Sequence, residues 1–390
     1  MLRREFCVRL LKAGAAVALT PLINACAPAE PEATAPAPTG TATAHPSPTA
    51  TPLTPTDTPV PTATYTPSPS YTPSSTPTAA ALSAAEPTAR VALVKTRDRV
   101  AGTRRAMEVL GINPAAGKPV LLKPNYNSAD PAPGSTETAM LRELVVMLNE
   151  MGAGKLTVAD RSGMGNTSAV MRAKGIPELA EDLGFDLVAL DTLTEEAFAL
   201  ITDENFHWPH GFAMPKMVLD AECIIQTCCL KTHRYGGHFT MSLKNSVGLV
   251  PGTPSGSGFV GSHNYMRDLH GSPHMRLMIA EINAAYTPAL IVMDGVEAFV
   301  QGGPATGTRA PTEVILASTD RVAIDAVGVA LLRMFGTTPQ VSEGRIFEQE
   351  QIARAVELGL GVDGPEKIEF ITGDAESEAY AAEIRNVLIA

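Results

Sequence analysis

Cysteine is scarce in this sequence of 390 residues, and its distribution excludes a protein stapled by disulfide bonds. Two of the five cysteines, Cys7 and Cys26, belong to the N-terminal leader described below. The other three, Cys223, Cys228 and Cys229, lie close together, and three thiols cannot close the disulfide framework of a small secreted domain. We expect them to be buried thiols at the end of a strand, with a zinc or iron site as the alternative.

Long apolar runs and positive charge are also in short supply. The alanine-rich segment from Ala13 to Leu22 is far shorter than the ~20 residues of a membrane-spanning helix, which excludes a stable one there. The chain has 30 Lys and Arg against 41 Asp and Glu, a formal net charge of −11. Such an acidic protein is not expected to bind nucleic acid or an anionic membrane surface, although a small anion can bind at a local basic pocket.

Residues 1–25 are similar to an export signal for a lipoprotein. Arg3-Arg4 followed by Phe6 resembles the twin-arginine motif, and the stretch that ends at Cys26 resembles a lipobox. The alternative is an ordinary general-secretory lipoprotein leader that contains two arginines by chance, since Leu2 replaces the usual Ser or Thr. Both leaders predict cleavage before Cys26, acylation of its thiol and a location outside the cytoplasm, anchored to the cell membrane.

Residues 26–90 form a low-complexity segment of Pro, Thr, Ser and Ala that holds nearly half of the 32 prolines. With almost no large apolar side chains, it cannot bury enough surface to offset chain entropy, so we expect a disordered linker. Because regular proline forces local extension, this linker is expected to act as a stalk. It would hold one folded domain, residues 91–390, away from the membrane.

From residue 91 onward, short apolar runs alternate with segments of helical periodicity. This pattern predicts an α/β fold with a mostly parallel sheet and helices on both faces. The predicted strands are residues 91–94, 120–123, 156–159, 186–190, 223–227, 289–293, 314–317 and 368–371. The predicted helices are residues 103–110, 137–151, 274–286, 321–335 and 349–358.

Polar residues follow the carboxyl ends of five of these strands, which is where open parallel sheets bind ligands. The richest ending lies in residues 223–252, where an apolar strand runs into lysines, histidines and asparagine broken by glycines. We expect the five endings to converge on one rim of the sheet, although an ending can also cap a helix or start a turn. They are Lys123-Pro124-Asn125, Asp160-Arg161-Ser162-Gly163, Lys231-Thr232-His233, Asp294-Gly295 and Ser318-Thr319-Asp320.

Eight residues of these segments are candidates for chemistry. Lysine suits an anionic ligand, asparagine can orient its oxygens, and histidine can move a proton. A carboxylate in an apolar helix must pair with a cation or face a site, so a structural ion pair is the alternative for Asp325. The candidate catalytic residues are His233, Lys231, Asp294 and Asp325, and the candidate substrate-binding residues are Lys123, Asn125, Lys244 and Asn245.

Five histidines between residues 233 and 274 make a divalent metal ion a candidate cofactor, although their spacing is not diagnostic. His270 and His274 are four residues apart, but the intervening Gly271 and Pro273 argue against a helical metal-binding pair. We expect His274 to open the next helix. The glycine loop of residues 302–307 could admit a ligand, but it matches neither a Walker loop nor a dinucleotide fingerprint.

Four ordered motifs carry a family resemblance. They are residues 120–125; residues 230–233 with 243–245 and 248–252; residues 293–296 with 302–307; and residues 315–326. Through them the chain resembles, over roughly residues 91–340, the family known as domain of unknown function 362, which implies no particular activity. Many relatives carry an added ferredoxin-like iron–sulfur module, but this chain has no C-x₂-C-x₂-C run, so that association does not extend to it.

These features predict an extracytoplasmic lipoprotein with a lipid anchor, a linker and one large α/β domain. We expect an enzyme that acts on a small, anionic, oxygen-rich substrate, with no reaction class assigned. The alternative is a membrane-tethered ligand- or metal-binding protein without catalysis. The single run of motifs favours the enzyme, because tethered solute-binding proteins are usually built from two similar lobes.

The lipid anchor can be tested directly. We expect Cys26→Ala to release the protein from membranes, because the substitution removes the thiol that would be acylated. Fractionation of cells into membrane and soluble parts measures this, and limited proteolysis near residue 90 should leave a resistant core in both proteins. A Cys26→Ala protein that stays on the membrane would contradict the predicted layout.

Overall fold

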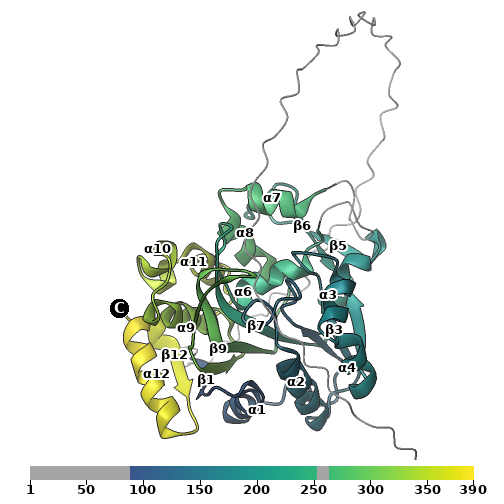
Figure 1. The fold of residues 1–390 in the computed structure, drawn as a ribbon. Coiled ribbons are helices and arrows are strands. Elements are labelled where there is room, and N and C mark those ends of the chain that lie inside the picture. Colours follow the sequence, from purple (N-terminus) through teal and green to yellow (C-terminus); the bar gives the residue numbers. More distant parts are fainter. Residues whose placement is uncertain (1–87, 253–262) are drawn as a thin grey trace, which may run out of the picture. The chain divides into compact units, whose positions relative to one another are not determined.

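The folded part of the chain is organised around one large sheet. The structure, a computed structural model, describes residues 88–252 and 263–390. In these residues ten strands form the sheet, and a further pair forms a separate hairpin (Figure 1). The main order is β12 (Ile368–Ile371), β1 (Ala89–Lys95), β11 (Val314–Ser318), β9 (Leu290–Gly302), β7 (Cys223–His233), β2 (Val120–Lys123), β3 (Leu156–Asp160) and β4 (Asp186–Ala189). Beside this path, β8 (His238–Thr240) pairs with β7 and β10 (Gly307–Ala310) with β9, and the hairpin consists of β5 (Phe198–Ile201) and β6 (Phe212–Pro215).

Strand direction confirms the predicted, mostly parallel α/β fold. β9, β7, β2, β3 and β4 are parallel to one another, and β1 is parallel to β12. Along the main order, β11 alone runs against its neighbours, β1 and β9. The carboxyl ends of β2, β3 and β7 therefore meet at the same edge of the sheet.

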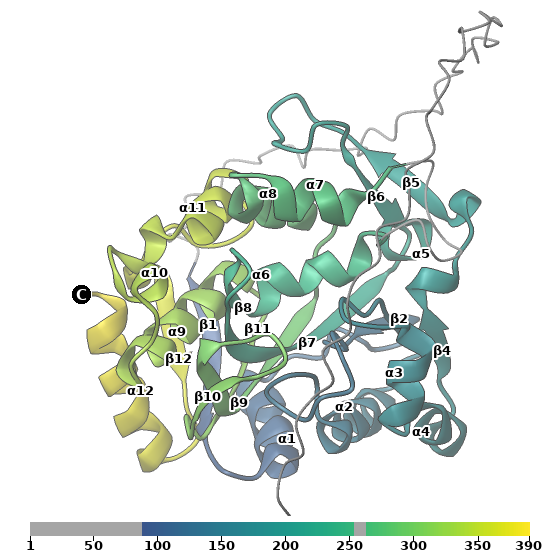
Figure 2. The ribbon, with the colours of Figure 1, turned by 45° about the horizontal axis from the view of Figure 1, so that its top comes forward.

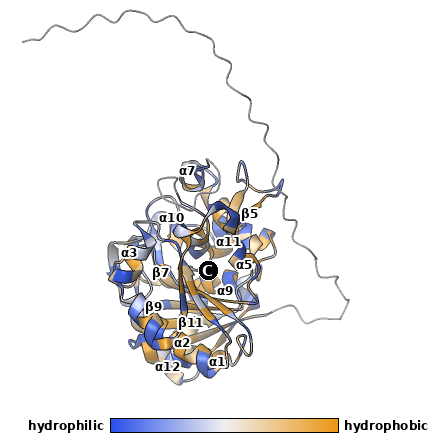
Figure 3. Cartoon of the chain, turned by 90° about the vertical axis from the view of Figure 1, so that its right-hand side faces the viewer, coloured by the Kyte–Doolittle hydropathy of each residue, from blue (hydrophilic) through white to orange (hydrophobic). Residues whose placement is uncertain are grey.

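Helices cover both faces of the sheet (Figures 1 and 2). Strand side chains alternate between the faces, so Val120 and Leu122 pack with one helical layer and Leu121 with the other. Helices α1 and α2 show both hydrophilic and hydrophobic surfaces, as expected for helices with one buried face (Figure 3). One layer contains α1 (Arg99–Leu110), α2 (Thr138–Glu150), α3 (Thr167–Ala173) and α4 (Ile176–Leu183). The remaining α-helices of the described residues contribute to the other two core clusters. They are α5 (Lys216–Leu219), α6 (Ser242–Asn245), α7 (Tyr265–Gly271), α8 (Met275–Ile282), α9 (Arg321–Met334), α10 (Pro339–Ser342), α11 (Glu350–Glu357) and α12 (Ala375–Leu388).

The predicted strands and helices all occur in the structure, but β7 and β9 continue far beyond their apolar runs. β7 was expected to end at residue 227, yet it is buried along its whole length to His233. The extension is held by pairing with β8, in which Lys231 lies opposite Thr240 and His233 opposite His238. Lys231 and His233 therefore lie on a buried strand and not in the loop that follows it.

The expectation that five strand endings share one rim is wrong for the ending at residues 318–320. Because β11 is antiparallel, its carboxyl end lies at the opposite edge of the sheet. Asp320 there caps α9, with its carboxylate accepting hydrogen bonds from Val322 N and Ala323 N, both at 2.8 Å. The alternative role of Asp320 as a helix cap is thus the observed one.

Several predicted features lie outside the described residues. These are the export signal, Cys26 and the linker up to residue 87. Within the described part of the chain, no helix has both the length and the apolar character to cross a membrane. The first strand begins at Ala89, two residues before the expected start of the folded domain at residue 91.

The cap at Asp320 generates a stability prediction. Its carboxylate also accepts a hydrogen bond from Val362 N at 2.9 Å, so Asp320→Ala should lower the free energy of unfolding by ~2 kcal/mol. Asp98→Ala is the matched control, since Asp98 caps α1 through two backbone N–H groups only, and its loss should cost ~1 kcal/mol. Urea unfolding measures both variants, and equal losses would contradict the added role of Val362.

Candidate functional site

The candidate site is a cavity at the carboxyl edge of the sheet, where the strand order reverses. β2, β3 and β4 follow one another outward, and the chain then returns to place β7 on the other side of β2. Ligand sites of open α/β sheets lie at such switch points. The cavity has a volume of about 50 Å³ and adjoins a cleft of about 980 Å³, with which it shares Arg161, His233 and Lys244. Its lining includes six of the eight predicted site residues: Lys123, Asn125, Lys231, His233, Lys244 and Asn245.

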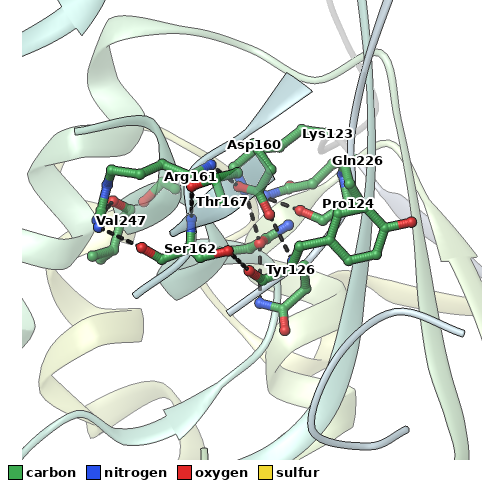
Figure 4. A network of polar contacts seen from close by, with 12 residues as sticks. Lys123, Pro124, Tyr126, Asp160, Arg161, Ser162, Thr167, Gln226 and Val247 are labelled. Carbon is green, nitrogen blue, oxygen red and sulfur yellow. Dashed lines mark hydrogen bonds and ion pairs between the residues drawn. The ribbon is translucent and has the colours of Figure 1, made fainter. Parts of the chain in front are cut away.

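The base of the cavity is a buried ion pair between the ends of β2 and β3. Lys123 Nζ lies 2.7 Å from Asp160 Oδ1 (Figure 4). The second carboxylate oxygen accepts a hydrogen bond from Tyr126 N at 2.6 Å, and Lys123 also donates to Pro124 O at 3.0 Å. Burial lowers the pKa of Lys123, and the charge of Asp160 opposes that shift. With oxygen acceptors around its ammonium group, we assign Lys123 as charged.

Gly248 allows this ion pair to approach the backbone that follows α6. A methyl group at position 248 would lie 2.6 Å from Asp160 Oδ1 and 2.9 Å from Lys123 Nζ. Both distances are too short for a Cβ, so the position needs a glycine. This gives a physical reason for the glycine that opens the motif at residues 248–252.

Two asparagines extend the network from Lys123 to Lys231. Asn245 Oδ1 accepts hydrogen bonds from Lys123 Nζ at 3.1 Å and from Asn125 Nδ2 at 3.2 Å. Asn125 Oδ1 in turn accepts a hydrogen bond from Lys231 Nζ at 3.1 Å. Asn245 Nδ2 donates to Thr227 O on β7, which ties α6 to the sheet. The amide groups are thus committed to positioning the two lysines.

Lys231 is fully occupied by protein acceptors. Besides Asn125, its ammonium group donates to Gly134 O and to Pro304 O, the latter at 3.1 Å. An ammonium group has three hydrogens, so Lys231 has none left for a ligand. It contributes positive charge to the cavity, while direct contact with an anion would require it to give up one of these bonds.

Lys244 differs from the other two lysines because its amine has no hydrogen-bond or ion-pair partner among the described residues. It lies on α6, its side chain is 7% exposed, and it lines both the cavity and the cleft. Burial, followed by the charges of Lys231 and Arg161, lowers the pKa of Lys244 to about 7. At neutral pH its amine is therefore divided between the charged and neutral forms.

His233 is a neutral imidazole beside these cations. Burial and then the charges of Lys244 and Lys231 hold its pKa well below the usual value of a histidine. Its Nδ1 is buried and has no hydrogen-bond partner within the described part of the protein. A neutral imidazole at the cavity wall can accept a proton from a ligand.

Arg161 is the residue of the site for which the sequence suggested no role, although it lies in a predicted strand ending. Its Nε donates to Val250 O at 2.6 Å and its terminal nitrogens donate to Ser162 O and Val247 O (Figure 4). These acceptors are uncharged carbonyls, so the guanidinium charge is not neutralised by them. The sequence feature that could have identified Arg161 as a site residue is its place directly after Asp160, the aspartate that ends a predicted strand.

Asp294 lies away from the cavity, which corrects its predicted membership of the site. Its carboxylate forms an ion pair with Arg99 Nε of α1 at 2.8 Å and accepts a hydrogen bond from Val296 N at 3.1 Å. The reason is that β9 continues through this position to Gly302, so Asp294 lies within the strand and not at its end.

Asp325 also lies away from the cavity lining, on α9, and acts on the site through α6. Its two carboxylate oxygens accept hydrogen bonds from Ser242 N at 2.7 Å and Leu243 N at 2.9 Å. Burial raises the pKa of Asp325 to about 7, and these two bonds oppose that shift. The carboxylate thereby fixes the first turn of the helix that carries Lys244, which makes it a positioning residue.

The cysteines and histidines are arranged as follows. Cys223, Cys228 and Cys229 are buried free thiols, as expected for packing groups. His274 is the residue that precedes the first turn of α8, as predicted. In residues 88–252 and 263–390, no group of three or more His, Cys, Asp or Glu side chains is arranged to hold a metal ion.

Comparisons with known proteins give a family and two likenesses. The model of the family described as domain of unknown function (DUF362) matches residues 120–330. The thylakoid-associated protein sll1697 of Synechocystis sp. is 26% identical over 243 residues, which cover 60% of this chain and 70% of that protein. The lactate racemase apoprotein of Thermoanaerobacterium thermosaccharolyticum is 13% identical, with a TM-score of 0.33 over 77% of this chain and 86% of that chain.

The buried ion pair generates the prediction for this site. Lys123→Met and Asp160→Asn should each lower the free energy of unfolding by roughly 3–5 kcal/mol, because each leaves an uncompensated buried group. The double variant should cost clearly less than the sum, since it leaves neither charge unpaired. Urea unfolding of the four proteins gives the coupling energy. Strictly additive losses would show that the two groups do not stabilise each other.

Proposed function

This chain belongs to the domain of unknown function 362 family, and because that description assigns no activity, we propose a function from the chemistry of the site. The proposal is an enzyme that binds a small, oxygen-rich anion in the cavity between β2, β7 and α6. Lys244 and Arg161 hold the anion, Lys123 and Lys231 add positive charge, and His233 moves a proton.

The excess of positive charge around one buried cavity carries this proposal. Among the residues that line it, four are cationic, namely Lys123, Arg161, Lys231 and Lys244, and the carboxylate of Asp160 opposes them. Such a cluster is costly to bury without a counter-ion, and the cost falls when an anion enters. The protein as a whole is acidic, at −11, so the cavity is a local exception that selects anions by charge.

The neutral His233 favours an enzyme over a binding protein without catalysis. Fixing an anion requires only donors, whereas a neutral imidazole has one N–H donor and one free nitrogen that can accept a proton, and burial keeps His233 in that neutral form. Saturable binding of organic anions with no turnover of any of them would favour the tethered binding protein instead. A divalent metal ion belongs to the proposal only as an ion that arrives with the substrate, because Asp160 already accepts hydrogen bonds at both oxygens.

The location proposed for this activity is outside the cytoplasm. The support is the pair Arg3-Arg4, the lipobox that ends at Cys26 and the proline-rich residues 26–90 that follow. An enzyme held on such a stalk would meet small anions in the extracytoplasmic space and not cytoplasmic metabolites.

Binding of an anion should depend on pH through Lys244. Because its pKa is about 7, Lys244 loses its charge as the pH rises through that value, and affinity for an anion should fall. Sulfate is the suitable probe, since its own charge is constant in this range. Titration calorimetry at pH 6 and pH 8, set on either side of about 7, should show sulfate bound roughly tenfold more weakly at the higher pH.

Lys244→Met is the variant that tests the assignment. It should bind sulfate more weakly at the lower pH and lose most of the pH dependence, because the titrating amine is gone. Lys118→Met, at an exposed lysine remote from the cavity lining, is the control and should behave as the unaltered protein. Sulfate affinity that is the same in all three proteins would overturn the anion site.

A further inference from the structure

Three lysines reach the same cavity, and their amines are in different states. Lys123 is paired with Asp160, and Lys231 donates to three oxygens. Lys244 has no such partner among the residues that the structure describes, although its side chain is buried and lines the cavity. Burial lowers the pKa of all three amines, but Lys123 and Lys231 donate hydrogen bonds to oxygens that favour the charged form, and Lys244 has no such partner in the described part of the chain.

The stem of Lys244 is held so that its amine cannot swing out freely. A Cβ at Gly237 would lie 2.5 Å from Lys244 Cε and 3.0 Å from Cδ, so the backbone of residue 237 packs closely against the side chain. The same atom would lie 3.1 Å from His233 Nδ1. The turn after β7 thus packs against both the stem of Lys244 and the ring of His233, and the charge of Lys244 contributes to lowering the pKa of His233.

An unpaired, desolvated lysine among other cations is the arrangement that activates an amine as a nucleophile. In an anion site, a lysine ordinarily serves as a hydrogen-bonded point charge. Lys231 is a hydrogen-bonded lysine of this kind, because its ammonium group donates to protein oxygens. We propose that Lys244 attacks the carbonyl carbon of an oxo acid and forms an imine with it. This inference rests on the proposed function and names the substrate class of that site: a carboxylate that also carries an aldehyde or ketone group.

The reaction balances without any further reagent. The Lys244 amine adds to the carbonyl carbon to give a carbinolamine, and the nitrogen loses a proton as the oxygen gains one. Loss of water then gives the C=N bond, and protonation makes it an iminium ion. His233, a neutral imidazole beside this amine, is the group that carries the proton from nitrogen to the departing hydroxyl.

The remaining cations fit the carboxylate of the same molecule. Arg161 lines both the cavity and the cleft, and its hydrogen bonds go to carbonyl oxygens and to Met266 Sδ, none of which is charged, so it can pair with an incoming carboxylate. The smallest such substrate is the two-carbon oxo acid, glyoxylate, and the cleft of about 980 Å³ adds space beside the cavity of about 50 Å³. A longer substituent would extend into the cleft, where exposed Met164 and Tyr235 provide apolar wall.

Reductive trapping tests the inference on the full-length protein. Glyoxylate and sodium cyanoborohydride, which reduces an iminium ion to a stable amine, should attach a carboxymethyl group to Lys244, to be located by peptide mass spectrometry. Lys123 and Lys231 are internal controls in the same cavity and should stay unmodified, and Lys118 is the exposed control. Modification of Lys244 should be roughly tenfold faster than that of Lys118 or more, because an ordinary lysine is almost entirely protonated at pH 7.

Two further measurements test whether Lys244 reacts as a neutral amine inside the anion site. The trapping rate at Lys244 should rise with pH through about 7, because the neutral amine is the nucleophile. Sulfate should compete with glyoxylate and slow the trapping. Lys244→Arg keeps the charge and removes the nucleophile, so it should still bind sulfate and give no trapped product at this position.

The outcomes separate this inference from the anion site on which it rests. Sulfate binding that depends on Lys244, with trapping no faster at Lys244 than at Lys118, would overturn the imine and keep the anion site. Rapid trapping at Lys244 that sulfate does not slow, with no sulfate binding, would overturn the anion site and keep the nucleophile. Equal modification of Lys123, Lys231 and Lys244 would show general reactivity and overturn the inference.

Discussion

The buried ion pair of Lys123 and Asp160 is the interaction on which the site depends. It joins the ends of β2 and β3 and, through Asn245 Oδ1, holds α6 against both strands. The same asparagine is linked through Asn125 to Lys231 on β7, so one continuous network spans three strands and a helix. A buried ammonium or carboxylate without partners would cost several kcal/mol, so these groups stabilise the fold only as a set. The position of the cavity follows from this network, since each member must reach the next.

The lysines of the cavity differ in the hydrogen bonds that they donate, and this difference separates the two structural lysines from the lysine that we propose to react. Lys123 and Lys231 have their hydrogens directed at protein oxygens, which fixes both their position and their charge. Lys244 has no such bonds among the described residues, and burial, followed by the charges of Lys231 and Arg161, lowers its pKa to about 7. Positive charge that is structurally stabilised thus raises the reactivity of the one amine that it surrounds. Burial, followed by the charges of Lys244 and Lys231, keeps His233 neutral, so the cavity combines an anion-attracting potential with a proton acceptor.

Residues that we do not expect to contact a ligand also set the geometry of the cavity, or act on it from another element. Asp325 accepts hydrogen bonds from the first two N–H groups of α6, and α6 is only one turn long, so it could not hold Lys244 in place unaided. Gly248 lets the backbone pass close to the ion pair, and Gly237 lets it pass close to Lys244. Gly237 and Gly248 lie in the stretch of residues 223–252 that also carries Lys231, Lys244 and Asn245, which accounts for the mixture of glycines, lysines and asparagine there.

The sequence by itself determined the α/β class and the strands and helices of the sheet, and it indicated six residues that line one cavity, because hydrophobic periodicity and polar strand endings are local signals. It also predicts a leader at residues 1–25, from the arginine pair and the lipobox, and a linker at residues 26–90, from composition. Only the tertiary structure decided which strand runs antiparallel, and thereby that Asp320 caps a helix at the far edge of the sheet. It also decided that Asp294 pairs with Arg99, that Asp325 holds α6, and that Lys231 is saturated while Lys244 is not. Hydrogen-bond saturation is a property of partners from distant segments, such as Gly134 and Pro304 around Lys231, and no local pattern encodes which distant oxygens will surround a given amine.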